Sequence, residues 1–366
     1  MLTTVAKALL LSLLAAAPAL AAVKPVTLTQ KLGRGRNVVV QIVEAQPGKP
    51  TFLFLPGVNR GLLLEEPAAQ ELIKNGNGVV GFNFSVQPLS INTLPSSEKA
   101  GFYDVEVTLD TLAAEAEGVA KMIKAQYQVK NLLPVSLSYT GAVSNKLKGF
   151  PAVIDAVPLT SMAAFSPELA MYRNWLRAGE FWNPIYGPGI TRAALDAAYR
   201  MQWTKQVEGM TQQFGLDRRR AGEMVDGYIR LSRATEGFEW KNGQTDRVKR
   251  TFIFAAKENP ALLRTQIEAA RERVAKGSGE SIFLVNESGH IIPAEQPIAY
   301  AKILELVAAG RNAPGVTLVT PSTGEFKTLS TEDSLRLLDK ALKELPTSPT
   351  GTRSTAPNGD RFPGTL

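Results

Sequence analysis

The chain has 366 residues, with 41 Lys and Arg against 34 Asp and Glu, a single His and no Cys. The absence of Cys excludes disulfides, thiolate metal sites and cysteine nucleophiles, and one His excludes a multi-histidine metal site. A hydrophobic fraction of 44% and a charged fraction of 20% are typical of a globular protein with a sizeable core. The chemistry that remains is built on carboxylates or around one imidazole.

The N-terminus has the features of an export signal. Lys7 precedes an apolar run of Leu and Ala, which ends in the small-residue pattern Ala19-Leu20-Ala21. We expect residues 1–21 to be cleaved, with an uncleaved membrane anchor as the alternative, because this run is too short to span a bilayer comfortably. Cleavage leaves a net charge of +6 on more than three hundred residues, which predicts no nucleic-acid partner. The sequence therefore predicts an exported protein, periplasmic or secreted, with no stable membrane span after signal removal.

Strand and helix patterns alternate along most of the remaining chain. Strands are predicted at Val38–Val43, Thr51–Leu55, Val79–Phe84, Leu132–Val135, Ala152–Val157, Thr251–Ala255 and Ser281–Val285. Helices are predicted at Pro67–Lys74, Val105–Tyr127, Tyr139–Leu147, Pro260–Lys276 and Pro297–Ala309. This alternation predicts an α/β fold, with a mostly parallel, doubly wound sheet covered on both faces.

Two segments differ from this pattern. Residues 161–247 have a helical pattern and contain all four Trp, which indicates a helical cap inserted between residues 22–160 and 248–345 of the core. Most of the cap aromatics are expected to form the insertion's own small core. Residues 346–366 are rich in Pro, Gly and Thr and are expected to form a disordered tail.

The first segment with catalytic potential is a strand that runs directly into a helix, with Ser138 at the junction. A serine on so sharp a turn exposes its hydroxyl, and the following amide, that of Tyr139, is placed to stabilise an oxyanion. Such a turn needs small residues two positions before and after the serine, where Ser136 and Thr140 stand. Ser136 as the nucleophile would shorten the strand. A helix-capping role for Ser138 is the plain alternative.

The second segment contains the sole histidine. His290 follows Gly289 in the loop after a predicted strand and precedes the helix that begins near Pro297. A general base must be held by a rigid element and still protrude into a cleft, which a loop after a strand achieves. A surface or capping histidine is the alternative, but a lone His at this place favours a catalytic role.

The third segment, Leu55-Pro56-Gly57-Val58, follows an early strand. Gly57 permits close approach of the backbone, and the amide of Val58 is a candidate for a second oxyanion donor. A plain strand-to-loop turn is the alternative, since Pro-Gly is common in turns.

The order of these segments resembles that of the α/β-hydrolase superfamily: oxyanion loop, serine turn, helical cap and a late Gly-His. The resemblance covers roughly residues 37 to 310. It implies a nucleophile, an acid and a histidine in that chain order, acting through an acyl-enzyme on an ester, amide or thioester. The chain departs from the family in lacking both glycines of the G-x-S-x-G turn and in having Pro56-Gly57 in place of His-Gly.

The acid is the largest departure from the family. There it follows the strand after the cap, in a pattern like Gly-x-x-Asp-Pro, where this chain has Glu258-Asn259-Pro260. Aligned on the proline, the Asp position holds Asn259, and Glu258 stands one residue earlier. Asp155 is a second candidate, because it ends the preceding core strand, from which some lipases of this fold take their acid. Glu258 ranks slightly ahead of Asp155, with Asn259 third.

The sequence therefore predicts an exported serine hydrolase that acts on a small-molecule, acyl or peptide substrate. Ser138 would be the nucleophile, His290 the base and Glu258 or Asp155 the acid. No metal or organic cofactor is needed, because serine, base and oxyanion donors suffice. The alternative is a catalytically inactive binding protein of the cell envelope with the same fold, motivated by the altered serine turn and by Asn259.

Overall fold

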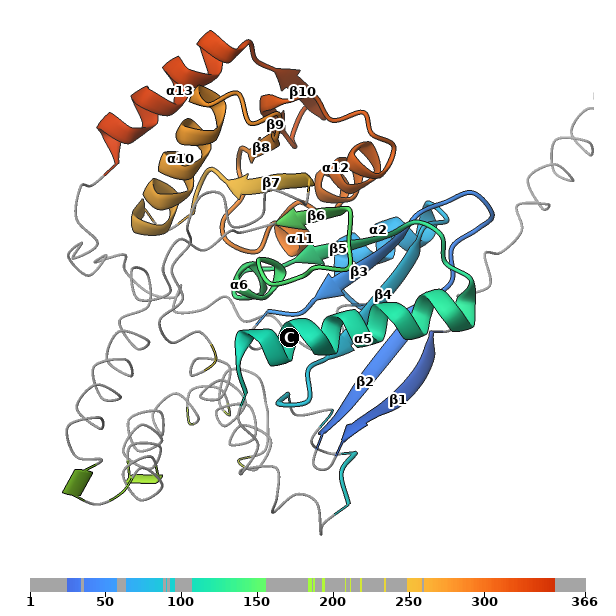
Figure 1. Ribbon diagram of the computed structural model, residues 1–366. Coiled ribbons are helices and arrows are strands. Elements are labelled where there is room, and N and C mark those ends of the chain that lie inside the picture. Colours follow the sequence, from blue (N-terminus) through green and yellow to red (C-terminus); the bar gives the residue numbers. More distant parts are fainter. Residues whose placement is uncertain are drawn as a thin grey trace, which may run out of the picture.

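A mixed β-sheet with helices on both faces makes up the described part of the chain (Figure 1). This computed structural model describes residues 25–33, 36–57, 64–87, 90, 93–95, 107–155, 249–258 and 260–345, with isolated positions between 184 and 234. The predicted signal peptide, the predicted tail and nearly all of the predicted cap lie outside the described residues.

The sheet is parallel through its centre and antiparallel at both edges. Its strands are β1 (Val26–Gly33), β2 (Arg36–Val43), β3 (Thr51–Leu55), β4 (Gly78–Asn83), β5 (Leu132–Ser136), β6 (Ala152–Asp155), β7 (Lys249–Ala255), β8 (Ser281–Val285), β9 (Gly315–Thr320) and β10 (Glu325–Thr328). They lie in the order β1-β2-β4-β3-β5-β6-β7-β8-β9-β10. The strands from β4 to β9 in this order are parallel, whereas β2 and β10 pair antiparallel with their neighbours. The predicted mostly parallel sheet is confirmed.

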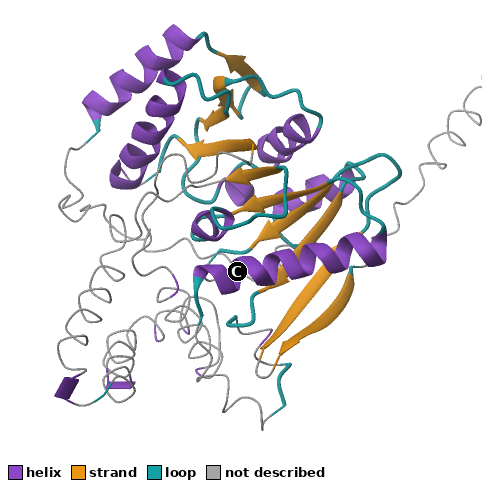
Figure 2. Cartoon of the chain, in the orientation of Figure 1, coloured by secondary structure: helices purple, strands orange, loops and turns teal. Residues whose placement is uncertain are grey.

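Helices lie in the described connections between the parallel strands and cover both faces of the sheet (Figure 2). They are α2 (Pro67–Lys74), α5 (Leu109–Tyr127), α6 (Thr140–Ser144), α10 (Pro260–Ala275), α11 (Ile292–Glu295), α12 (Pro297–Ala308) and α13 (Thr331–Glu344). Helices α5, α6, α10 and α13 pack on one face, and α2, α11 and α12 pack on the other.

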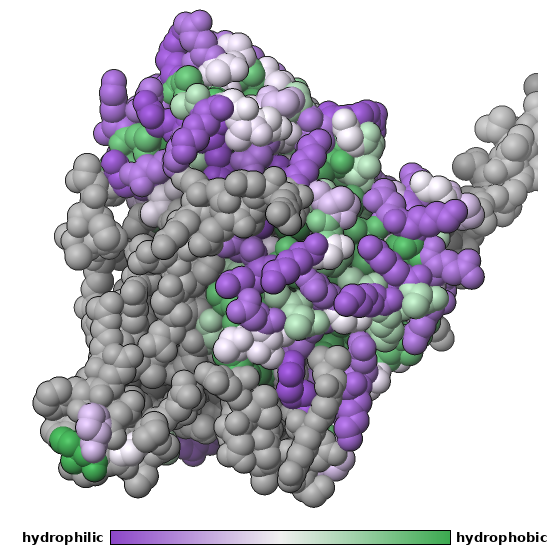
Figure 3. All heavy atoms as spheres, viewed as in Figure 1, coloured by the Kyte–Doolittle hydropathy of each residue, from purple (hydrophilic) through white to green (hydrophobic). Residues whose placement is uncertain are grey.

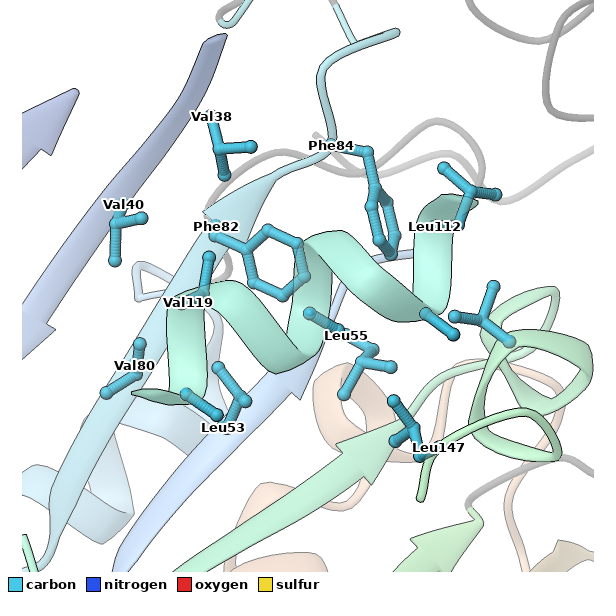
Figure 4. Packing of buried hydrophobic residues seen from close by; sticks show 14 of the residues in the cluster. Val38, Val40, Leu53, Leu55, Val80, Phe82, Phe84, Leu112, Val119 and Leu147 are labelled. Atoms are coloured by element: carbon cyan, nitrogen blue, oxygen red, sulfur yellow. The ribbon is translucent and has the colours of Figure 1, made fainter. Parts of the chain in front are cut away.

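The central strands are buried on both faces, and β3 shows how. Phe52 and Phe54 point into the core beneath α2 and α12, whereas Leu53 and Leu55 point into the core beneath α5. Figure 4 shows the second core, where Leu53 and Leu55 lie close to α5. Successive side chains of a strand point to opposite faces, so a strand covered on both sides is a continuous apolar run. This is why the sequence pattern identified the central strands.

Several elements differ from the sequence-based expectation. The helix expected from Val105 begins at Leu109, because the Oγ1 atom of Thr108 caps it by accepting from the N–H of Thr111 at 3.1 Å. The helix expected over Tyr139–Leu147 is the shorter α6. The sequence patterns did not predict β1, β9, β10, α11 or α13. The edge strand β10 is mostly exposed, so it lacks the apolar pattern of a core strand. Helix α13 has Leu335, Leu338 and Leu342 at helical spacing, and these residues pack against the sheet although charged residues surround them in the sequence.

The outer surface of the described residues is mainly hydrophilic on the face drawn in Figure 3, over the outer sides of α5 and α13. Large exposed hydrophobic side chains in the described part of the chain are scattered, at Val26, Ile185 and Ile298. Single exposed hydrophobic residues are normal for a globular surface. None of the helices in the described ranges is both long enough and apolar enough to cross a membrane.

We expect Phe52→Ala to lower the free energy of unfolding by about 3–5 kcal/mol, because it leaves a cavity in a core that both α2 and α12 line. Ile298→Ala is the control, since Ile298 is 70% exposed and its loss should cost no more than about 0.5 kcal/mol. Urea unfolding followed by circular dichroism measures both values. Equal losses in the two variants would contradict this description of the core.

Candidate active site

The predicted catalytic residues and the predicted oxyanion loop follow the carboxyl ends of parallel strands. Gly57 comes after β3, Ser138 after β5, Glu258 after β7 and His290 after β8. Parallel strands end at a common edge of the sheet, so loops that are far apart in the sequence meet there. This edge is the candidate active site.

Ser138 lies in a strained turn between β5 and α6. Its φ is 54°, in the left-handed region that non-glycine residues rarely adopt. The two neighbouring side chains are buried in opposite cores, that of Leu137 beneath α2 and α12 and that of Tyr139 beneath α5. This packing holds the turn in place and leaves Ser138 between them, half-buried. A strained residue at such a place costs about 1–3 kcal/mol and is typical of functional sites.

Thr140 holds the same turn through its hydroxyl group. Its Oγ1 accepts from the N–H of Leu137 at 2.8 Å and donates to the carbonyl of Leu55 at 2.9 Å, with the Leu137 carbonyl 3.0 Å away. The side chain is fully buried. Thr140 therefore ties the serine turn to the end of β3.

His290 lies between the serine and a carboxylate. Its Nε2 is 2.8 Å from the Oγ of Ser138, and its Nδ1 is 2.6 Å from Oε2 of Glu258. An ionised carboxylate can only accept hydrogen bonds, so Nδ1 carries the proton and donates a hydrogen bond to Glu258. The lone pair of Nε2 then faces the serine hydroxyl. This is the arrangement in which an imidazole can take a proton from serine.

Backbone hydrogen bonds hold the two loops that carry Glu258 and His290. The N–H of Ala256 donates to the carbonyl of Val285 at 2.9 Å, and the N–H of Lys257 donates to the carbonyl of Ser288 at 2.9 Å. The pairing of β7 with β8 thus continues past the ends of both strands. It brings Glu258 beside His290, although they are 32 positions apart in the sequence.

The Glu258 carboxylate is the buried charge of this site. Its side chain is 4% exposed, against 29% for the imidazole of His290. A buried carboxylate needs a partner, and the imidazole Nδ1–H supplies one. Across the residues that the structure describes, no three His, Asp or Glu side chains gather in a group that could hold a metal ion.

The other predicted site residues have different positions. Asp155 ends β6, paired with Ser136 of β5, and its side chain is outside the described residues, as are Val58 and Asn259. Ser136 is fully buried, so the accessible serine of the turn is the half-buried Ser138. Tyr139 is the residue that precedes α6. The structure therefore brings together Ser138, His290 and Glu258 of the predicted set.

Two solved structures are similar to this one over most of both chains. A membrane phospholipase A, described as a bacterial virulence factor, has a TM-score of 0.51 and 14% identity over 85% of this chain and 93% of its own. MGS-M2, an α/β-hydrolase enzyme from a Medee basin deep-sea metagenome library, has a TM-score of 0.50 and 13% identity over 78% of this chain and 97% of its own. The chain has the α/β-hydrolase fold. Neither a family model nor a curated protein matches the sequence.

Two further side chains contact the site loops and were not predicted from the sequence. The buried side chain of Gln87 accepts from the N–H of Phe84 at 2.8 Å and donates to the carbonyl of Gly57 at 3.2 Å, which ties the predicted oxyanion loop to the end of β4. The carboxylate of Glu295 accepts from two amides of the His290 loop. Gln87 contacts a loop 30 positions away that only the fold brings near, whereas Glu295 contacts amides four and six positions before it in the sequence.

We expect Thr140→Val to lower the free energy of unfolding by about 1–3 kcal/mol, because the valine keeps the shape but leaves the buried N–H of Leu137 without an acceptor. Thr140→Ser keeps the hydroxyl and should recover most of that loss. Urea unfolding of the two variants measures the difference. A valine variant as stable as wild type would show that the hydroxyl does not hold the turn.

Replacing Ser138 with glycine should raise the free energy of unfolding by about 1 kcal/mol relative to Ser138→Ala, because glycine adopts a positive φ without strain. Both variants lack the hydroxyl, so the comparison isolates the backbone. Thermal and urea unfolding provide the measurement. Equal stability of the two variants would mean that the turn stores no strain.

Proposed function

We propose that this α/β-hydrolase is an exported serine hydrolase that cleaves an ester, amide or thioester through an acyl-enzyme on Ser138. One observation carries the proposal: the imidazole of His290 spans the distance between the Ser138 hydroxyl, at 2.8 Å, and the buried Glu258 carboxylate, at 2.6 Å. A helix-capping serine and a surface histidine, the two plain alternatives, do not require this contact.

The proposed reaction begins with transfer of the Ser138 proton to Nε2 of His290 as Oγ bonds to the carbonyl carbon of the substrate. Glu258 stays ionised and stabilises the imidazolium through the Nδ1–H hydrogen bond. The tetrahedral intermediate collapses when Nε2 gives that proton to the leaving group. The products of this step are the released leaving group and an ester of Ser138.

Water completes the proposed cycle. His290 Nε2 takes a proton from water as the water oxygen attacks the acyl carbon, and returns it to Ser138 Oγ as the acid is released. The amides of Tyr139 and Val58 are the proposed donors to the oxyanion in both halves of the reaction. Because Gln87 holds the carbonyl of Gly57, it supports the loop that carries the second donor.

Glu258 takes the place in this proposal that Asp holds in the family pattern. A glutamate is one methylene longer than an aspartate and here stands one residue earlier than the aligned position. The backbone bond from Lys257 to Ser288 brings the two loops close enough for this contact. Asp155 and Asn259 remain the alternatives against which the acid is tested.

Export is proposed from the sequence alone. Lys7, the apolar run and Ala19-Leu20-Ala21 support cleavage of a signal peptide and a periplasmic or secreted mature enzyme. The proposed substrates are small molecules, acyl esters or peptides, and a net charge of +6 on so long a mature chain supports no role in nucleic-acid binding.

The test is labelling of the mature protein with a fluorophosphonate probe, which reacts with activated serines. We expect wild type to be labelled, Ser138→Ala to be unlabelled, and His290→Ala and Glu258→Gln to react at least roughly 10³-fold more slowly, since each loses part of the proton relay. Asp155→Asn is the matched control and should react within a few-fold of wild type.

The outcomes separate the alternatives. Loss of labelling in Asp155→Asn with retention in Glu258→Gln would assign the acid to Asp155. A folded wild-type protein that no fluorophosphonate labels would overturn the hydrolase proposal. It would favour the alternative, a binding protein of the cell envelope that keeps the fold without turnover.

A further inference from the structure

One carboxylate, that of Glu295, binds the backbone of the loop that carries His290. Oε2 of Glu295 accepts from the N–H of Gly289 at 2.6 Å, and Oε1 accepts from the N–H of Ile291 at 3.3 Å. These are the amides immediately before and after His290. Both oxygens of one side chain therefore bind the backbone on the two sides of the proposed base.

The position of Glu295 is itself held by the same loop. Its own N–H donates to the carbonyl of Ile291, the residue that precedes α11, at 3.0 Å. Ile291 and Glu295 are thus linked in both directions, backbone to backbone and backbone to side chain. Hydrogen bonds to a charged acceptor are roughly twice as strong as neutral ones, and two of them fix orientation as well as distance.

Gly289 leaves the room that this contact needs. A Cβ built on Gly289 would lie 3.1 Å from Oε1 of Glu295 and 3.4 Å from Oε2. Any other residue would therefore require the carboxylate to move by a few tenths of an ångström. The glycine before the histidine fits this close approach, and its φ is not in the left-handed region.

We infer that Glu295 is a positioning residue, which holds the imidazole of His290 in line with both Ser138 and Glu258. The inference rests on the proposed function, since it assigns a role in the same reaction. Glu295 acts through the backbone and does not contact the reacting atoms. A displacement of about 1 Å in a catalytic group can cost up to roughly 100-fold in rate, so a loop that loses both hydrogen bonds should react markedly more slowly.

A purely structural role is the competing explanation, because glutamates commonly reach back to amides that precede a helix. The chain contains a matched control for that role. Glu117 of α5 accepts from two successive loop amides, those of Lys148 at 2.6 Å and Gly149 at 3.3 Å. This contact also joins a carboxylate to two loop amides, at the same two distances, although a single oxygen, Oε1, accepts both hydrogen bonds. Its loop lies between α6 and β6 and carries none of the proposed catalytic groups.

The experiment compares Glu295→Ala with Glu117→Ala in hydrolysis of p-nitrophenyl butyrate and in fluorophosphonate labelling. We expect Glu295→Ala to lower kcat roughly 10-fold with KM within about two-fold of wild type. Glu117→Ala should lose similar stability and keep wild-type kcat. Glu295→Gln keeps one acceptor oxygen and should lie between wild type and the alanine variant.

A second measurement does not depend on turnover. His290 is the only histidine in the chain, so a protein without a histidine tag and with ¹⁵N-labelled histidine gives one pair of ring-nitrogen signals. We expect one sharp pair in wild type and in Glu117→Ala, and broadened or doubled signals in Glu295→Ala as the ring samples other positions.

The two readouts distinguish failure of this inference from failure of the proposed function. If Glu295→Ala keeps both wild-type kcat and a sharp wild-type ring signal, Glu295 does not position His290. If wild type neither hydrolyses the ester nor reacts with the fluorophosphonate, the hydrolase proposal fails, and the ring signal alone decides whether Glu295 holds the imidazole. Equal loss of kcat in Glu117→Ala and Glu295→Ala would show that both contacts act only through the stability of the fold. That result would overturn the inference.

Discussion

The parallel pairing of the central strands is the constraint on which the candidate site depends. Because β3, β5, β7 and β8 run in one direction, the loops that follow them meet at one edge of the sheet. Parallel strands require crossover helices, and these cover both faces and bury the strands completely. A rigid, two-sided core thereby positions groups that are up to 152 residues apart in the sequence.

The cores on the two faces of the sheet also hold the strained serine turn in place. The positive φ of Ser138 is unfavourable, yet Leu137 and Tyr139 are buried in opposite cores and prevent relaxation. Thr140 adds two hydrogen bonds from its hydroxyl, where the family pattern has a glycine. A residue larger than glycine therefore fits this position when its hydroxyl hydrogen-bonds to the neighbouring backbone groups.

Hydrogen bonds to loop backbone recur around the site. The side chain of Gln87 donates to the carbonyl of Gly57, in the loop that follows β3. The loop of His290 accepts a backbone hydrogen bond from Lys257, and the carboxylate of Glu295 accepts from the amides on both sides of the histidine. Loops have few apolar contacts to hold them, so side chains and backbone bonds of this kind must define their geometry. A proton relay with contacts of 2.6 Å and 2.8 Å needs that definition.

The sequence by itself determined the fold class and narrowed the chemistry. Two-sided burial makes each central strand a continuous apolar run, and a chain with one His and no Cys leaves few mechanisms. Only the tertiary structure decided which carboxylate meets His290, how Thr140 supports the serine turn and that Glu295 binds the His290 loop. These contacts join residues by loop geometry and by pairing between distant strands, and neither leaves a periodic pattern in the sequence.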